Sequence, residues 1–383
     1  MNPETIRHYQ LNKQHLIYAD DHDDYAAVLK GHIALHSTDY VTPYLSLWAR
    51  TGNFDPSALF DDLSVNRRAL RLRAFRGTVF VAHSESLADI LGSGEYYQAT
   101  RLAEIKRFKA GKYIDFSALE QDVIELLSGD KQMNAREMRQ AVGGDMKGDV
   151  FSILLRLMEF KGILARAGQR YITDKVIRYG LMREWVPDID YDAIDPHESL
   201  KNLMRRYIRQ FGPVCLDDIC WWFPLKKATA REILEHIRDE LRTFDFNNRS
   251  YIMEKNDFNE LNAFKPPSGG EPVVSFLPYE DHFPKAYYVR DWYISAETTP
   301  SVFHVGKLDY GQIRPSVWIE GEVIGRWEME WTDTKKTSMK VDIIDLIHER
   351  SREREVSGLI EKRRMALEEF INNQLVPLLK GNS

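Results

Sequence analysis

The spacing of hydrophobic residues between residues 117 and 173 predicts three helices followed by two strands. The first helix, 117–128, starts with a cap-like Ser117 and has leucine and valine residues at helical spacing. Asn134 and Asp149 are suitable N-caps for the second and third helices. Two short β-rich runs then flank Ala167-Gly168-Gln169, a pattern typical of a hairpin. Three helices closed by a hairpin are the element order of a winged helix.

The same order recurs between residues 197 and 256. Helices are predicted at 197–210, 216–223 and 229–241, with breaks at Phe211-Gly212-Pro213 and Pro224-Leu225. The following run, FDFNNRSYIME, has two β-rich halves around an Asn-Asn pair that is typical of a tight turn. We therefore predict a second winged helix here.

The first 115 residues are less regular. They predict short helices at 10–16, 24–35 and 43–50, and a further helix that starts with an Asp55-Pro56 cap. The run AFRGTVFVAHSE alternates as a pair of strands, and the chain then returns to a helix. This pattern predicts another, elaborated winged helix.

The C-terminal third has a different pattern. A Pro/Gly-rich linker at 263–272 precedes strand-like runs between 273 and 331, among them SVFHVGKL and a hairpin turning at Glu320-Gly321. Residues 340–347 fit a last strand or a helix, and 349–379 form an amphipathic helix. The predicted fold class is α+β, mainly α: three tandem winged-helix domains, a β-rich unit and a long C-terminal helix. The predicted bounds are 1–115, 116–190, 197–262, 270–348 and 349–383.

Composition limits the class of protein. The 383 residues are 43% hydrophobic and 29% charged, which is typical of a soluble globular chain. The sequence has no apolar run of about 18 residues and no secretory h-region, so we expect no membrane span and a cytoplasmic protein. Only two cysteines, Cys215 and Cys220, are present, which excludes a disulfide scaffold and a four-cysteine zinc site.

The net charge of −6 hides a local excess of basic residues. A nucleic-acid-binding domain often has a pI above about 9, whereas this chain has a pI of about 6.0. Arginines nevertheless cluster between residues 67 and 76 with almost no acidic neighbour in the sequence, and basic residues cluster again between 101 and 112. Such clusters favour contacts with phosphates. The predicted DNA-binding residues are Arg71, Arg73, Arg76, Arg101, Lys106 and Arg107.

Common cofactor motifs are missing from the sequence. There is no GxxxxGK[ST], no GxGxxG after a strand and no HExxH. Cys215, Cys220 and His236 lack a fourth ligand at a suitable spacing. We therefore expect neither a metal nor a cofactor.

One polar segment between two apolar helices is a candidate for chemistry. His36, Ser37, Thr38 and Asp39 separate a helix that ends near Leu35 from one that contains Pro43. Thr38 or Asp39 could simply cap the second helix. Alternatively, His36 and a carboxylate could converge on one water molecule beside a sugar, as hydrolysis of a glycosidic bond requires. The catalytic candidates are therefore His36, Thr38 and Asp39, expected at an exposed junction on the same concave surface as the arginine cluster.

Several segments, in order, carry a family resemblance. They read LHSTDYVTPYLSLWARTGNFDPSALFDDL, LRLRAFRGTVFVA, YIRQFGPVCLDDICWWFPL, FLPYEDHFPKAYYVRD and RPSVWIEGEVIGRW. Together they resemble the AlkZ/YcaQ-like winged-helix DNA glycosylases over nearly the whole chain. The resemblance implies a monomer with a basic channel that holds duplex DNA. It also implies monofunctional release of alkylated purines, including bulky adducts and interstrand crosslinks, with no lysine Schiff base and no metal.

The proposed catalytic segment departs from the family pattern. The family's glycosylases have Gln-x-Gln or Gln-x-Asp here, whereas this chain has His36 at the first position and Thr38 at the second, and Asp39 comes one residue later. Histidine can still hydrogen-bond and polarise a water. Two functions follow: a DNA glycosylase that uses His36, Thr38 and Asp39, or a DNA-binding protein or regulator of the same fold without catalysis.

Overall fold

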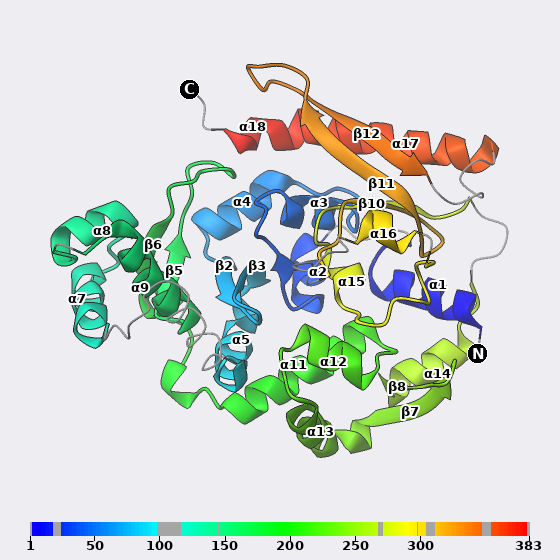
Figure 1. Cartoon of the computed structure of the whole chain (residues 1–383), viewed down its shortest axis with the longest axis horizontal. Helices are drawn as coiled ribbons and strands as arrows, with labels where there is room; N and C mark the ends of the chain where they lie inside the picture. Colours follow the sequence, from blue (N-terminus) through cyan, green and yellow to red (C-terminus); the bar gives the residue numbers. More distant parts are fainter. Residues whose placement is uncertain are drawn as a thin grey trace.

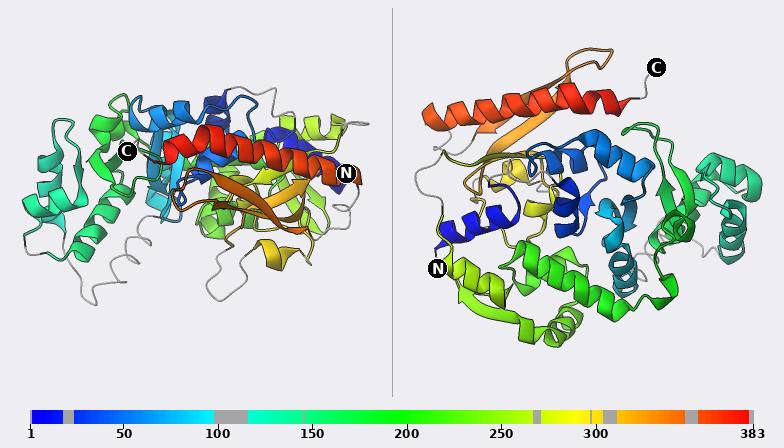
Figure 2. Two further views of the ribbon diagram at one scale, coloured as in Figure 1. Left: turned by 90° about the horizontal axis from the view of Figure 1, so that it is seen from above. Right: turned by 180° about the vertical axis from the view of Figure 1, so that it is seen from behind.

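The computed structural model of the chain describes residues 2–17, 24–97, 116–144, 146–266, 271–296, 298–303, 311–346 and 354–380. About half of these residues are helical, and the strands form small antiparallel sheets around which the helices are arranged (Figure 1). The fold is therefore mixed α/β. Seen from behind, the long C-terminal helix lies along the upper edge of the molecule (Figure 2, right).

The N-terminal part contains one three-stranded sheet. Its elements are α1 (Pro3–Lys13), α2 (Tyr25–Gly31), β1 (Leu35–His36), α3 (Thr42–Trp48), α4 (Pro56–Ser64), β2 (Ala69–Ala74), β3 (Thr78–His83), a 3₁₀ turn (Ser84–Ser86) and α5 (Leu87–Ser93). The sheet order is β1-β3-β2. Asp55 caps α4 as predicted, accepting a hydrogen bond from the Ser57 amide. The helix expected over 24–35 ends at Gly31, because Ile33 has a positive φ of 67° and turns the chain into β1.

The next segment repeats this arrangement. Its elements are α7 (Ser117–Leu127), β4 (Met133–Asn134), α8 (Ala135–Val142), α9 (Gly148–Phe160), β5 (Leu164–Ala167), β6 (Arg178–Leu181) and α10 (Met182–Trp185), with sheet order β4-β6-β5. Asn134 caps α8 as predicted, in a capping box with Glu137. The other two caps were wrong, since Phe116 and Lys147 occupy the N-cap positions of α7 and α9.

The predicted hairpin around Gly168 was wrong in its second strand. β5 pairs with Arg178–Leu181 and not with residues 170–173. Residues 168–177 instead form a loop that reaches the end of the chain. The Ile172 amide donates to the Leu378 carbonyl at 2.9 Å, and the Thr173 hydroxyl donates to the Leu379 carbonyl. The hydrophobic pattern of a short stretch of sequence cannot predict a contact between segments so far apart.

A third segment follows the same order. Its elements are a 3₁₀ turn (Tyr191–Ala193), α11 (Pro196–Phe211), α12 (Leu216–Trp222), α13 (Lys227–His236), a 3₁₀ turn (Arg238–Glu240), β7 (Leu241–Phe246) and β8 (Arg249–Glu254). The predicted turn is present, with Asn247 and Asn248 at φ values of 48° and 59°. Val214 bridges Ile252 and so takes the place of a first strand. The last helix ends at His236, not at Leu241, because Leu241 begins β7.

The C-terminal part combines a four-stranded sheet with a long helix. Its elements are α14 (Lys255–Ala263), β9 (Val274–Leu277), α15 (His282–Lys285), α16 (Thr299–Val302), β10 (Ser316–Ile319), β11 (Glu322–Trp331), β12 (Met339–Leu346), α17 (Arg354–Phe370), a π-helical turn (Ile371–Leu375) and α18 (Val376–Leu379). The sheet order is β12-β11-β10-β9, and the hairpin turns at Glu320-Gly321 as predicted. The prediction of a strand over SVFHVGKL is wrong for the part of this run that the structure describes, because Ser301 and Val302 belong to α16.

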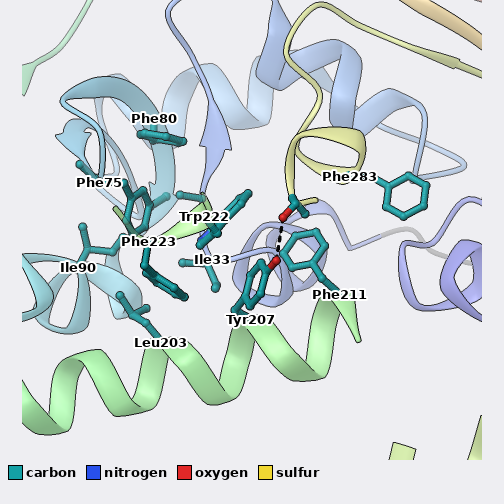
Figure 3. Packing of buried hydrophobic residues seen from close by; sticks show 14 of the residues in the cluster. Ile33, Phe75, Phe80, Ile90, Leu203, Tyr207, Phe211, Trp222, Phe223 and Phe283 are labelled. Carbon is teal, nitrogen blue, oxygen red and sulfur yellow. Dashed lines mark hydrogen bonds between the residues drawn. The ribbon is translucent and has the colours of Figure 1, made fainter. Parts of the chain in front are cut away.

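Two hydrophobic cores lie next to β1: Ala34 belongs to one of them and Leu35 to the other. One joins the N-terminal sheet to α11, α12 and the segment around Phe283. In it, Tyr207 stacks on Trp222 at 5.5 Å and donates a hydrogen bond to the Ala286 carbonyl at 2.7 Å (Figure 3). The other core places α3 against the C-terminal sheet and α17. Segments distant in the sequence are thus fixed around the residues that follow β1.

A fully buried ion pair ties α3 to the segment between β9 and α15. The Arg50 guanidinium donates to both carboxylate oxygens of Asp281, at 2.9 and 2.7 Å, and neither side chain is exposed. The Ser46 hydroxyl donates to the same carboxylate at 2.8 Å, and Asp281 also accepts the Phe283 amide. This pair fixes the position of Glu280 relative to α3.

Replacing Asp281 should test this constraint. Asp281→Ala leaves a buried guanidinium without its counterion, so we expect a loss of about 3–5 kcal/mol in the free energy of unfolding. Urea denaturation measures this quantity. The matched control, Arg183→Ala, breaks an exposed pair with Asp192 and should leave the midpoint unchanged. Similar midpoint shifts for both variants would contradict the role assigned to the buried pair.

Candidate active site

The segment that follows β1 carries the catalytic candidates. His36 pairs with Phe80 of β3, and strand alternation directs it away from the core that contains Leu35. The His36 and Phe80 rings are nearly perpendicular, with their centres 5.5 Å apart. The junction was expected to be exposed; this is wrong for His36, which is 7% exposed, and for Ser37, whereas Thr38 is exposed. His36 is therefore almost fully enclosed, and its Nδ1 is buried without a hydrogen-bond partner among the described residues.

A carboxylate from a distant segment lies next to His36. Glu280 Oε2 is 3.7 Å from His36 Nε2 and 2.6 Å from Lys285 Nζ. Glu280 Oε1 accepts the Ile313 amide at 2.7 Å. The backbone of Glu280 has a φ of 56°, a strained conformation for a residue with a side chain. The surrounding bonds hold this carboxylate against the imidazole.

The environment keeps His36 neutral. Burial lowers the pKa of His36 to about 4, and the ammonium of Lys285 also lowers it, whereas the carboxylate of Glu280 acts in the opposite direction. His36 Nε2 lies 3.4 Å from the Thr38 hydroxyl. A neutral imidazole at this position can accept a proton from a water molecule.

Asp39 takes part in local structure with one oxygen. Its Oδ1 accepts the Val41 amide at 3.0 Å, one residue before α3 begins. The expectation that Thr38 or Asp39 caps this helix is wrong, because Val41 occupies the N-cap position and the helix has no side-chain cap hydrogen bond. Asp39 is half-buried beside exposed Thr38. Its second oxygen makes no hydrogen bond among the described residues.

Arg71 contacts the backbone of the segment that carries the catalytic candidates. Its guanidinium donates to the Ser37 carbonyl at 2.7 Å and to Gln169 Oε1 at 3.3 Å, and it lies 3.5 Å from the centre of the Tyr40 ring. Arg71 is 8% exposed, and burial lowers its pKa to about 10. The guanidinium stays charged at neutral pH and fixes the backbone between His36 and Thr38.

The expectation that the arginine cluster lacks acidic partners was wrong. Arg67 pairs with Asp130, and Arg68 pairs with Asp62. Arg73 donates to Glu159 at 2.9 Å and to the Gly77 carbonyl at 2.9 Å. Asp130 and Glu159 lie beyond residue 116, where inspection of the local sequence could not find them, whereas Asp62 lies only six residues before Arg68.

Arg76 belongs to a cationic group beside Glu280. Its guanidinium lies 3.7 Å from the centre of the Trp221 ring, and Arg290 and Lys285 lie 5.3 and 5.9 Å from the same ring. The Trp221 ring nitrogen donates to the Lys285 carbonyl at 2.9 Å. An aromatic face attracts cations. The structure therefore brings Arg76 to the site, while Arg101, Lys106 and Arg107 lie outside the described residues.

Sequence analysis did not single out Glu280, Lys285 and Arg290. All three lie in FLPYEDHFPKAYYVRD, a segment that contributed to the family resemblance without any residue being assigned a role. The available signal was the density of charged residues in an otherwise aromatic run. Neither cysteine adds to the site, since Cys215 is buried and Cys220 partly buried as free thiols. Among the described residues, no group of three or more histidine, cysteine or acidic side chains could hold a metal.

Comparison with known proteins shows similarity to a protein family and to a solved structure. A family model described as DNA glycosylase AlkZ-like matches residues 29–367. The solved structure of Streptomyces sahachiroi DNA glycosylase AlkZ is similar with a TM-score of 0.75 and 16% sequence identity, over 97% of this chain and 96% of that one. No curated protein matches the sequence. The family model covers most of the chain, and the structural match supports the same fold.

The low pKa of His36 predicts a pH-dependent stability. The unfolded chain takes up this proton near pH 6.5 and the folded chain only near pH 4, so the unfolded state binds more protons between these values. Stability is lost as pH falls through this window. His36→Gln lacks this proton uptake, so its free energy of unfolding relative to wild type should rise by about 2–3 kcal/mol between pH 7.5 and pH 4.5.

Urea denaturation of the two proteins at both pH values measures this difference. His197→Gln, at a half-buried histidine on α11, provides the control and should follow the wild type. A constant difference between wild type and His36→Gln would show that His36 titrates normally in the folded state.

Proposed function

The chain belongs to the AlkZ-like DNA glycosylase family, and we propose that it hydrolyses the N-glycosidic bond of alkylated or crosslinked purines in double-stranded DNA. It is thus an enzyme of the DNA glycosylase class, with DNA as its substrate. The lesion class is what the family resemblance implies. An alkylated purine leaves readily because the electrons of the broken bond neutralise its positive charge, so little acid catalysis of departure is needed.

One observation supports hydrolysis most directly: neutral His36 lies within 3.7 Å of Glu280 and 3.4 Å of Thr38. In the proposed step a water held by His36 Nε2 attacks C1′ of the sugar while the bond to the base breaks. His36 takes the proton that the water loses. Glu280 orients the imidazole and, with Lys285, fixes its surroundings. Asp39, with Thr38, steadies the positive charge that develops on the sugar.

The proposed reaction is monofunctional and independent of a metal. Lys285 is the lysine next to His36, and its ammonium is engaged by Glu280 and by the Gly311 carbonyl at 3.0 Å. This engagement favours water over a lysine amine as the nucleophile. Resistance to chelators and the absence of strand cleavage before alkali treatment are the corresponding expectations.

We further propose that the three repeated segments are winged-helix domains that hold the duplex. Each has the order helix, short strand or bridge, two helices and a hairpin. The domain bounds predicted from the sequence, action as a monomer and a cytoplasmic, nucleoid-associated location belong to the same proposal. Among the described residues, no helix is both long and apolar enough to cross a membrane.

Base release from a duplex that contains N7-methylguanine tests the proposed function. His36→Ala should slow single-turnover release by about 10²–10⁴-fold, the range for loss of one acid–base group. His36→Gln, the residue type of the family pattern, can still hold the water but cannot take its proton, so it should recover only part of the rate that His36→Ala loses. Asp39→Asn preserves the acceptor for the Val41 amide but removes the charge, and it should also slow release.

Several controls define this experiment. His197→Ala should release base at the wild-type rate, and EDTA should have no effect. Abasic sites are detected by alkali cleavage, and trapping with borohydride tests for a lysine adduct. A wild-type protein that binds the duplex but releases no base would favour the non-catalytic alternative. Full activity of His36→Ala would remove His36 from the mechanism.

A further inference from the structure

A small cavity beside the catalytic segment is lined by guanidinium groups. Its lining includes Tyr40, Arg71, Arg166, Gln169 and Arg178. The cavity volume is about 20 Å³, room for about one water-sized atom group. A base is far too large for it, whereas a single anionic oxygen fits. Its lining residues include no carboxylate.

The guanidinium groups at this cavity are incompletely used by the protein. Arg71 is buried, and its Nε has no hydrogen-bond partner. The side chain of Arg166 is 10% exposed and pairs with Glu159 through Nε at 2.5 Å. No hydrogen bond to a described residue engages its two terminal nitrogens. Donors of this kind, held in a fixed planar geometry, bind phosphate oxygens well.

The local charge balance leaves an excess of positive charge. Glu159 is shared by Arg73 and Arg166, and Asp39 acts on Arg71 from the other side. Arg178 adds a further, exposed guanidinium at the cavity. The guanidinium groups of Arg71, Arg73, Arg166 and Arg178 thus outnumber the two carboxylates, those of Asp39 and Glu159. Burying such an excess without a counterion is unfavourable, so an anion at the cavity mouth would stabilise the arrangement.

We propose that this cavity binds one backbone phosphate of the DNA, next to the nucleotide whose base is removed. This inference rests on the proposed function, because Arg71 links the cavity directly to the Ser37 carbonyl of the catalytic segment. Arg71 and Arg166 would donate to one non-bridging oxygen of the phosphate, and Arg178 would approach from the exposed side. The phosphate would then set the register of the sugar beside His36.

The test combines protein variants with DNA in which one phosphate at a time is neutral. The probe is a duplex with a tetrahydrofuran abasic analogue and a single methylphosphonate, moved along the flanking positions. At one position the methylphosphonate should weaken binding of the wild-type protein about 10-fold. The same methylphosphonate should weaken binding of Arg166→Gln less than about 2-fold, because this variant has already lost its contact with that phosphate. Arg166→Gln should also reduce the slope of log affinity against log salt by about one.

Two further variants keep this result interpretable. Arg178→Gln changes an exposed residue, should fold normally and should show the same coupling at the same position, with a smaller effect. Arg156→Gln, an exposed arginine of α9 that does not line the cavity, is the matched control and should show no coupling there. Coupling at no phosphate position for both cavity variants would overturn the proposal.

The experiment distinguishes failure of the phosphate site from failure of the proposed function. It also distinguishes binding of a DNA phosphate from binding of free phosphate. Binding to the abasic analogue requires no base release, so an inactive wild type that shows the coupling would refute hydrolysis but keep the phosphate site. Inorganic phosphate, titrated without DNA, should not bind at millimolar concentration. Binding of phosphate that Arg166→Gln abolishes, without coupling on DNA, would contradict the assignment to the DNA backbone.

Discussion

The buried pair between Arg50 and Asp281 is the interaction on which the candidate site most depends. It lies between two segments separated by more than half the chain, and it brings the helix after His36 against the loop that carries Glu280. Both charges are removed from water, so the pair itself adds little net stability. Its main effect is geometric, because only one arrangement of the two segments satisfies the guanidinium and the carboxylate together.

The distribution of charge explains how an acidic protein can present a cationic site. The net charge of −6 describes the whole sequence, whereas two carboxylates, Glu159 and Glu280, each serve more than one basic group. Around each of them guanidinium or ammonium groups are left in excess. DNA responds to the field near its phosphates, screened within about 10 Å at moderate salt, and not to the total charge of the protein.

Much of the fold could be predicted from local patterns. Asn134 and Asp55 marked helix starts, and the Asn247-Asn248 and Glu320-Gly321 turns followed from residues that tolerate positive φ. The site could be predicted only in part. His36 and Arg76 were found from the sequence, but Glu280 was not, because its proximity to His36 arises from tertiary packing. The strand at Arg178 was missed for the same reason: the ten residues before it are held by the C-terminal helix.

The contact between the 168–177 loop and α18 has a consequence for how the protein matures during synthesis. The loop carries Gln169, which contacts Arg71, and it is anchored by carbonyls of Leu378 and Leu379. N-terminal segments of a growing chain generally fold first. The arginine-lined cavity, however, can take its final form only after residues almost four hundred positions from the N-terminus have been added. A nascent chain can therefore contain the strands and helices of the N-terminal part while this wall of the cavity is still unfinished, until residues 378 and 379 have been added.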